Sequence, residues 1–176
     1  MRLETKRLVL HPLTAENLNA ARKNLSAVAH ALGVSSGHVG FWENMTKKRI
    51  YSAKLEIIEN FPNAWLLSTT WFITANGEVV GEAGFKGPPD RNDAIEIGYS
   101  TREKFRNCGY MTEAVGALTR FAFDQTALYV GAVTALTLPE NVASHSVLIK
   151  NGFSKQPSFG KYWFWSKSRE EQERQA

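Results

Sequence analysis

The segment IEIGYSTREKFRNCGYMTEA, which spans Ile95–Ala114, decides the fold. Its first half alternates apolar and polar residues, as a half-buried β-strand does. A short basic stretch with Arg102, Lys104 and Arg106 follows, and a helix begins at Gly109. A helix N-terminus presents unpaired N–H groups and a positive dipole end, and glycine lets an anion approach the backbone. The segment therefore predicts a strand, an anion-binding turn and a helix.

The turn differs from the common nucleotide-binding loops. It lacks the Gly-Lys-Ser/Thr of a P-loop and the three-glycine spacing of a dinucleotide fingerprint. Taken alone, a glycine at a helix start is more often an ordinary cap or turn than a pyrophosphate site. The spacing leaves both interpretations open.

Hydrophobic periodicity and turn residues outline the remaining elements. We expect a strand over Arg7–Leu13, helices over Ala15–Leu32 and Lys47–Asn60, a β-prone run over Ala64–Thr74, strands over Glu78–Lys86 and Ala94–Thr101, a helix over Tyr110–Phe123, a strand over Tyr129–Leu138, a helix over Asn141–Asn151, and an antiparallel pair over Phe153–Pro157 and Lys161–Lys167. Asn76-Gly77 is the strongest short hairpin signal.

This order places a three-strand meander before a crossover helix. Such an arrangement predicts an α/β (mixed α+β) fold with a central mixed, mostly antiparallel sheet of six to seven strands and about four flanking helices. The 176 residues fit one domain, which we assign to 1–168. We expect the polar tail 169–176 to be frayed.

Composition excludes several classes of protein. A single cysteine, Cys108, forms no internal disulfide, and no signal peptide or membrane span is visible, so we expect a cytoplasmic location without membrane contact. The four histidines lack metal-ligand spacing, so we expect no metal. A net charge of +4 suits a polyanionic ligand or merely solubility. We expect no nucleic-acid partner, and either a monomer or a homodimer.

Three motifs resemble those of the GNAT superfamily of N-acetyltransferases. Arg106–Ala114 resembles the acetyl-CoA motif Arg/Gln-x-x-Gly-x-Gly/Ala, with Met111 in the place of Gly or Ala. Pro139–Phe153 resembles the helix Asn-x-x-Ser-x-x-x-Leu/Tyr-x-Lys-x-Gly-Phe. Leu3–Leu10 is similar to the start of the branch that acetylates ribosomal-protein N-termini. The resemblance covers essentially the whole chain.

This resemblance implies acetyl-CoA as the acetyl donor and direct attack by the amine. The pantetheine arm and acetyl carbonyl would lie along the strand, and the pyrophosphate at the turn. The implied coenzyme-binding residues are Ile97, Tyr99, Ser100, Thr101, Arg106, Asn107, Cys108, Gly109, Tyr110, Met111, Thr112 and Asn141. Asn141 is also a plausible simple N-cap, and both roles are compatible.

Two carboxylates, Glu82 and Glu96, are candidates for the general base. If Lys86 pairs with Ala94, then Gly84 faces Glu96 and Glu82 lies diagonally on the same face. Two nearby carboxylates raise one pKa toward a useful value. A solvated face for both residues, a one-residue register slip and a water-relayed base are the open alternatives.

For the acid, many GNAT relatives place a tyrosine seven residues after the asparagine, where this chain has Leu148. In the ribosomal branch a serine stands near the thiolate, and Ser144 fits that position. Its alternative is an early-helix hydroxyl that bonds its own backbone. Cys108 lacks a positioned histidine, and this chemistry needs no cysteine nucleophile.

We therefore predict an acyltransferase, an N-acetyltransferase that acts on a primary amine of a protein N-terminus or a small molecule. The alternative is a non-catalytic acyl-CoA-binding sensor or interaction module, which Met111 and Leu148 favour. The sequences of two segments, Leu32–Met45 and Gly87–Asp93, do not predict which acceptor amine would bind. Phe41 and Trp42 are candidates to wall the acceptor pocket, although such aromatics are more often core residues.

Overall fold

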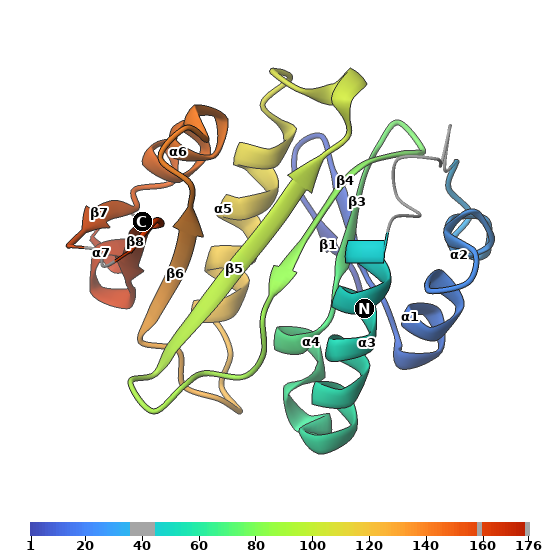
Figure 1. The fold of residues 1–176 in the computed structure, drawn as a ribbon, viewed down its shortest axis with the longest axis horizontal. Helices are drawn as coiled ribbons and strands as arrows, with labels where there is room; N and C mark the ends of the chain where they lie inside the picture. Colours follow the sequence, from blue (N-terminus) through green and yellow to red (C-terminus); the bar gives the residue numbers. More distant parts are fainter. Residues whose placement is uncertain (36–44, 158–159, 175–176) are drawn as a thin grey trace.

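The computed structural model describes residues 1–35, 45–157 and 160–174. In these segments eight strands form one sheet in the order β1-β2-β3-β4-β5-β6-β8-β7 (Figure 1). All neighbouring strands are antiparallel except β5 and β6. The strands are β1 (Leu3–Glu4), β2 (Val9–Pro12), β3 (Trp71–Ala75), β4 (Glu78–Phe85), β5 (Ala94–Thr101), β6 (Ala132–Thr137), β7 (Ser154–Gln156) and β8 (Trp163–Ser168).

Helices cover both faces of this sheet. They are α1 (Ala15–Ala21), α2 (Leu25–Ala31), α3 (Met45–Asn60), α4 (Trp65–Ser68), α5 (Tyr110–Phe123), α6 (Val142–Lys150) and α7 (Arg169–Glu173). In Figure 1, α3 lies on the near side of the sheet and α5 lies behind β5. In the described segments, none of the helices combines the length and apolarity that crossing a membrane requires.

Alternation along β3 divides the interior into two cores. Trp71 and Ile73 belong to the core under α5, while Phe72 between them belongs to the core under α1 and α3. The α5 side takes Ile95 and Ile97 of β5 as well. The even-numbered residues of β5 therefore face α3.

The segment that decides the fold is as predicted. β5 covers Ala94–Thr101 and α5 covers Tyr110–Phe123, with the predicted bounds in both cases. The hairpin between β3 and β4 is also confirmed. Asn76 and Gly77 have φ of 48° and 75°, the left-handed pair that a type I′ turn requires.

Two predicted elements differ from the structure. The helix expected over Ala15–Leu32 is split into α1 and α2, because Asn24 adopts an extended φ of −151° and its side chain caps α2 by accepting from Ala27 N. The β-prone run Ala64–Thr74 begins with the short helix α4. Trp71 Nε1 donates to the Leu66 carbonyl at 3.1 Å, so tertiary contacts override strand propensity there.

The tail and the strand count also differ. The chain from Arg169 to Glu173 is helical, so the expectation of a frayed tail is wrong there. Ser168 and Glu171 form a capping box, and Arg169 Nε donates to the Val130 carbonyl at 3.1 Å. The sheet has eight strands rather than six to seven. The described segments contain seven α-helices rather than about four, and the additional helices are short.

We predict that Gly84→Ala destabilises the fold by about 2 kcal/mol, because a Cβ there would lie 2.4 Å from the Thr69 carbonyl oxygen. Its cross-strand partner Gly98 is the matched control. A Cβ at Gly98 meets no described atom within 4 Å, so Gly98→Ala should be neutral or slightly stabilising. Denaturant unfolding of both variants measures the difference, and equal stabilities would contradict the packing at Gly84.

Candidate active site

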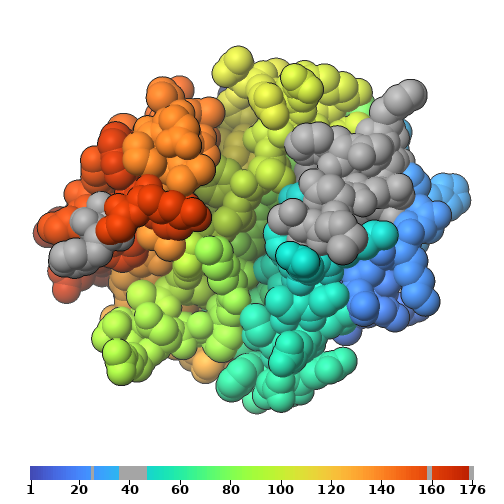
Figure 2. All heavy atoms as spheres, in the orientation of Figure 1, coloured from blue at the N-terminus to red at the C-terminus, as the bar shows by residue number. Residues whose placement is uncertain are grey.

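The edge of β5 is open where β5 and β6 diverge. Their parallel pairing covers only Ala94–Glu96 against Ala132–Thr134. Beyond it, β5 continues along β4 and β6 continues along β8, and no other described strand pairs with the edge between them. Figure 2 shows the surface recessed between α6 (orange) and the start of α3 (teal).

Backbone groups of three residues face this open edge. Arg102 N donates to the Val80 carbonyl at 2.9 Å, and Lys86 N donates to the Glu96 carbonyl at 2.8 Å. Alternation between these bonds directs Gly98 and Ser100 toward β4. The N–H groups of the remaining residues point into the open edge; they belong to Ile97, Tyr99 and Thr101.

Ser100 differs from the other three residues that were expected to bind along this strand. Its backbone faces β4, and its side chain lies on the α3 face, where Ser100 Oγ is 3.1 Å from Lys47 Nζ. Ser100 therefore does not present its backbone to the open edge, as its neighbours do.

The turn before α5 has the geometry of an anion site. Asn107 and Gly109 both have positive φ, 60° and 75°, and Gly109 is the N-cap of α5. No side chain caps this helix end, so the N–H groups of Tyr110, Met111 and Thr112 point out of the first turn. The Arg106 and Cys108 side chains are exposed beside them.

Two of the three basic side chains expected beside this turn, Arg102 and Lys104, contact an acidic residue. Arg102 is buried, donates to the Val79 carbonyl at 2.8 Å and lies 3.4 Å from Glu78 Oε1. Lys104 Nζ lies 2.5 Å from the same Glu78 oxygen. Glu78 therefore offsets one of the two positive charges of Arg102 and Lys104, while the exposed Arg106 lies 3.9 Å from Glu103.

Met111 does not fill the turn. Its side chain is buried in the core under α5, where the absence of a side chain at Gly81 makes room for it. A Cβ at Gly81 would lie 3.0 Å from Met111 Cε. The departure from the Gly/Ala motif is thus absorbed on the core side, and Met111 still offers its backbone N–H.

The N-terminal segment is tied to the same turn through Glu113. Glu113 accepts hydrogen bonds from Thr5 Oγ1 at 2.6 Å, from Arg7 N at 2.9 Å and from Arg7 Nε at 2.7 Å. Arg7 also donates to the Cys108 carbonyl at 3.0 Å, and its guanidinium lies 4.9 Å from the Tyr110 ring centroid. We call these contacts of Glu113 with Thr5 and Arg7 the Glu113 clasp. No local sequence pattern predicts the Glu113 clasp, because it links residues more than a hundred positions apart.

A cavity of about 330 Å³ lies between α3 and the α3 face of β4 and β5. We call it the Glu82 cavity, because the Glu82 carboxylate is its buried acid, with 6% of the residue exposed. Glu82 accepts a hydrogen bond from Tyr51 OH at 2.8 Å and forms an ion pair with Lys47 Nζ. Burial lowers the pKa of Lys47 to about 8 and raises that of Tyr51.

A second lysine, Lys54, also lines the Glu82 cavity. Its Nζ donates to the carbonyls of Ser68, Thr69 and Phe85 at 3.2, 3.0 and 2.7 Å. Burial, aided by the charge of Lys86, lowers the pKa of Lys54 to about 7. Its three carbonyl contacts fix Lys54 as a link between β4 and the chain that enters β3.

The predicted register of the two candidate bases is wrong by two residues. Gly84 pairs with Gly98, so Glu82 faces Ser100, and Lys86 lies across from Glu96. Glu96 is four positions from Ser100, ~13 Å along the strand. Each carboxylate has its own lysine, with Lys86 Nζ 2.5 Å from Glu96. The carboxylates share a face but do not form a close pair.

The start of α6 lies across the open edge. Asn141 Oδ1 accepts from Ser144 N at 3.1 Å, so Asn141 is the N-cap of α6. Tyr99 OH donates to the Ser144 carbonyl at 3.2 Å and bridges β5 to α6. Burial raises the pKa of Tyr99 to about 12. No described residue hydrogen-bonds the Ser144 hydroxyl, and Leu148 is wholly buried in the core.

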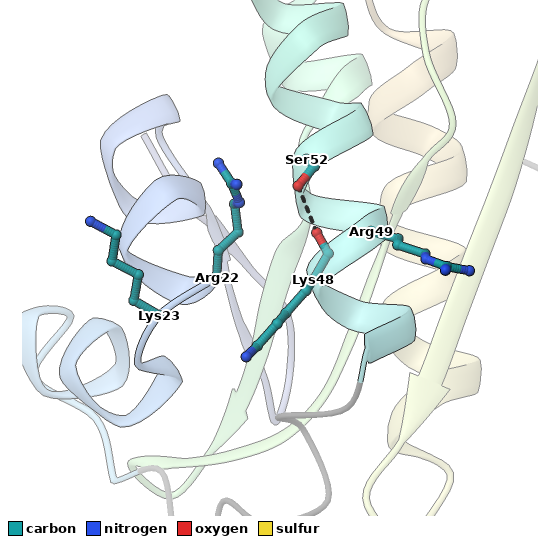
Figure 3. A pocket seen from close by; sticks show the side chains of 5 residues that line it. All are labelled: Arg22, Lys23, Lys48, Arg49 and Ser52. Atoms are coloured by element: carbon teal, nitrogen blue, oxygen red, sulfur yellow. Dashed lines mark hydrogen bonds between the residues drawn. The ribbon is translucent and has the colours of Figure 1, made fainter.

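A separate basic pocket of about 370 Å³ lies between the end of α1 and the start of α3. Figure 3 shows the residues that line it, Arg22, Lys23, Lys48, Arg49 and Ser52. Ser52 Oγ donates to the Lys48 carbonyl at 2.9 Å, and the pocket shares no lining residue with the Glu82 cavity. None of the residues that line this pocket carries a carboxylate.

Phe41 and Trp42 lie outside the described residues. Within the described part of the chain, no group of three or more His, Cys, Asp and Glu side chains is placed to hold a metal ion.

Comparison with known proteins gives consistent results. Residues 7–154 match the acetyltransferase (GNAT) domain family. The chain is 32% identical over 165 residues to the uncharacterized N-acetyltransferase YjdG of Bacillus subtilis, covering 93% of this chain and 95% of that protein.

Two solved structures share the fold. One is a RimL ribosomal L7/L12 α-N-protein acetyltransferase in complex with coenzyme A, with a TM-score of 0.68, 14% identity and coverage of 97% and 99% of the two chains. The other is a ribosomal-protein-S5-alanine acetyltransferase from Vibrio fischeri, with a TM-score of 0.64, 15% identity and coverage of 96% of each chain.

We predict that Glu113→Gln lowers the free energy of unfolding by about 1 kcal/mol at neutral pH, because the clasp to Thr5 and Arg7 loses its charge. Burial opposes ionisation of Glu113, but the hydrogen bonds from Thr5 and Arg7 prevail and lower its pKa from the usual 4.5. A lowered folded pKa stabilises the protein above the unfolded pKa, and this contribution disappears as pH falls through the folded pKa. The deficit of the variant should therefore shrink in acid.

Denaturant unfolding between neutral pH and acid measures this effect. Glu103→Gln is the matched control, because Glu103 lies at the same turn, is 85% exposed and is no closer than 3.9 Å to Arg106. A deficit for Glu113→Gln that does not change with pH would contradict the ionic clasp.

Proposed function

Because the chain belongs to the acetyltransferase (GNAT) domain family, we propose that it transfers the acetyl group of acetyl-CoA directly to the primary amine of a protein N-terminus or a small molecule. The observation that carries this proposal is the open edge of β5 beside a cavity with a buried carboxylate. Donor and acceptor would approach β5 from these two sides and meet at the strand.

The donor side fits a coenzyme with a pyrophosphate and an amide-rich arm. Acetyl-CoA supplies the acetyl group as an activated thioester. The N–H groups of Ile97, Tyr99 and Thr101 would hold the arm and polarise the acetyl carbonyl. The turn at Asn107–Thr112, with Arg106 beside it, would hold the pyrophosphate. Asn141 keeps its amide N–H groups for the pantetheine while its oxygen caps α6.

On the acceptor side, the geometry supports Glu82 over Glu96 as the base. Glu82 is buried, lies across from Ser100 and lines the cavity. An amine that enters the cavity would replace Lys47 Nζ next to the carboxylate, and Tyr51 OH would keep the carboxylate oriented. Glu96 lies where β5 is still paired with β6 and is bound to Lys86.

The leaving thiolate would form between β5 and α6. Ser144 is close to this point, because its carbonyl accepts from Tyr99 OH. Its hydroxyl would donate to the thiolate. The phenol of Tyr99, with its raised pKa, stays protonated and holds the two sides in place. Leu148 cannot take the role of the tyrosine that many relatives use.

For the acceptor, we favour a protein N-terminus. The similarity of Leu3–Leu10 to the ribosomal-protein branch supports it, as do the names of the two structural relatives. A cavity of about 330 Å³ accommodates a terminal residue or a small amine. A small-molecule amine is therefore the second acceptor class to test.

The first test is release of free CoA from acetyl-CoA with a panel of amines and short peptides. We predict that release depends on one acceptor class and that Glu82→Gln lowers kcat/KM by about 10²–10⁴-fold, because the base is lost. Glu96→Gln is the matched control and should keep most of the activity.

Acetyl-CoA affinity, measured in parallel, shows that each variant is folded. Unchanged turnover in Glu82→Gln would place the base elsewhere. Acetyl-CoA binding without turnover of any acceptor would favour a sensor or interaction module, and no binding at all would contradict the proposed function.

We predict that Ser144→Ala lowers kcat about 100-fold with little change in KM, because a donor that acts only on the developing thiolate is removed. Ser146→Ala is the matched control, because Ser146 is an exposed residue of the same helix. A loss in acetyl-CoA affinity with normal kcat would assign Ser144 to binding instead.

A further inference from the structure

The amine of Lys47 occupies the position that an acceptor amine would take. Lys47 belongs to the first turns of α3 and reaches into the Glu82 cavity, and its side chain is only 13% exposed. Its Nζ forms an ion pair with Glu82 and lies 3.1 Å from Ser100 Oγ. Lys47 thus brings a primary amine, the candidate base and the strand with the open edge together.

We propose that the protein acetylates its own Lys47 Nζ when acetyl-CoA is bound and no acceptor amine occupies the Glu82 cavity. This step rests on the proposed function, because it uses the same donor and the same base. It assigns a modification site in this chain, and the amine is delivered by α3 rather than by a second molecule.

The transfer balances with acetyl-CoA as the only co-reactant. The Lys47 ammonium gives one proton to the Glu82 carboxylate, and its nitrogen forms a bond to the acetyl carbonyl carbon. The thioester C–S bond breaks, and the sulfur leaves with the second proton of the nitrogen as the thiol of CoA. Glu82 then returns its proton to solvent. Burial lowers the pKa of Lys47 to about 8, so loss of a proton from its ammonium is easier than from an exposed lysine.

Lys54 shows why position, rather than acidity, selects the site. Its pKa, about 7, is lower still, but its Nζ is directed at the carbonyls of Ser68, Thr69 and Phe85. Those carbonyls lie on β4 and on the chain that leads into β3, away from the open edge of β5. Lys48, the next residue of α3, lines the separate basic pocket. The geometry therefore favours one lysine of the three.

Acetylation of Lys47 changes the cavity as well. The amide carries no charge, so the ion pair with Glu82 is lost while the hydrogen bond from Tyr51 remains. An acceptor ammonium that enters afterwards meets a carboxylate without its lysine. Self-acetylation and acceptor acetylation therefore compete for Glu82 only until Lys47 is acetylated.

The test incubates the purified full chain with acetyl-CoA and no acceptor, and follows its mass and its peptide map. We expect one added acetyl group on Lys47, at a rate that does not depend on protein concentration, since the amine and base belong to one chain. Lys54 should stay unmodified. Lys47→Arg should lose the modification, and Lys48→Arg, the matched control on α3, should retain it.

Three outcomes would overturn the proposal. Acetylation of acceptor amines by the same preparation, with Lys47 unmodified, would reject self-acetylation and leave the proposed function standing. Lys47 acetylation that proceeds equally in urea-unfolded protein or in Glu82→Gln, or whose rate rises with protein concentration, would identify a chemical or intermolecular reaction. Absence of acetyl-CoA binding would reject both the self-acetylation and the proposed function.

Discussion

The divergence of β5 from β6 is the constraint on which the site depends. A parallel pair that continued past Glu96 would bond the N–H groups of Ile97, Tyr99 and Thr101 to β6. Instead β6 is held by β8 along its whole length, and β5 is held by β4. Unpaired backbone donors in a partly buried cleft are unfavourable unless a ligand or water satisfies them. The fold therefore leaves a row of backbone donors that a chain-like ligand would satisfy, and the N-terminus of the helix that connects the two strands adds further N–H groups at the end of this row.

The Glu82 cavity exists because the two faces of the same strands differ in side-chain size. On the α5 side, β5 contributes Ile95 and Ile97 to a filled core. On the α3 side, Gly84 and Gly98 face each other, and a Cβ at Gly98 would meet no described atom within 4 Å. Space at Gly98 together with a carboxylate at Glu82 leaves a hollow with a buried charge at one end. Such a charge needs partners, and Lys47 and Tyr51 of α3 provide them.

Local sequence patterns predicted the elements that depend on local interactions. β5, α5 and the Asn76-Gly77 hairpin follow from periodicity, a helix start and a left-handed turn. The register of β4 against β5 did not follow, because the connection between them contains no two-residue turn that fixes it. The observed register differs from the predicted one by two residues. Glu82 and Glu96 therefore still share a face of the sheet, but they are not close together. Lys47 and the Glu113 clasp were missed for a related reason, since both join segments that are distant in the sequence.

The charged residues on the two sides of β5 have different partners. On the donor side, Glu78 offsets only one of the charges of Arg102 and Lys104, so a net positive charge and the helix N-terminus remain to attract an anion. On the acceptor side, two buried lysines of the described residues are directed at partners: Lys47 at Glu82 and Lys54 at three carbonyls. Under the proposed function, an incoming ammonium would gain the attraction of Glu82 by replacing Lys47. Under the proposed function, selection of an acceptor would therefore depend on how well its amine competes with Lys47, the same residue that the proposed self-acetylation would modify.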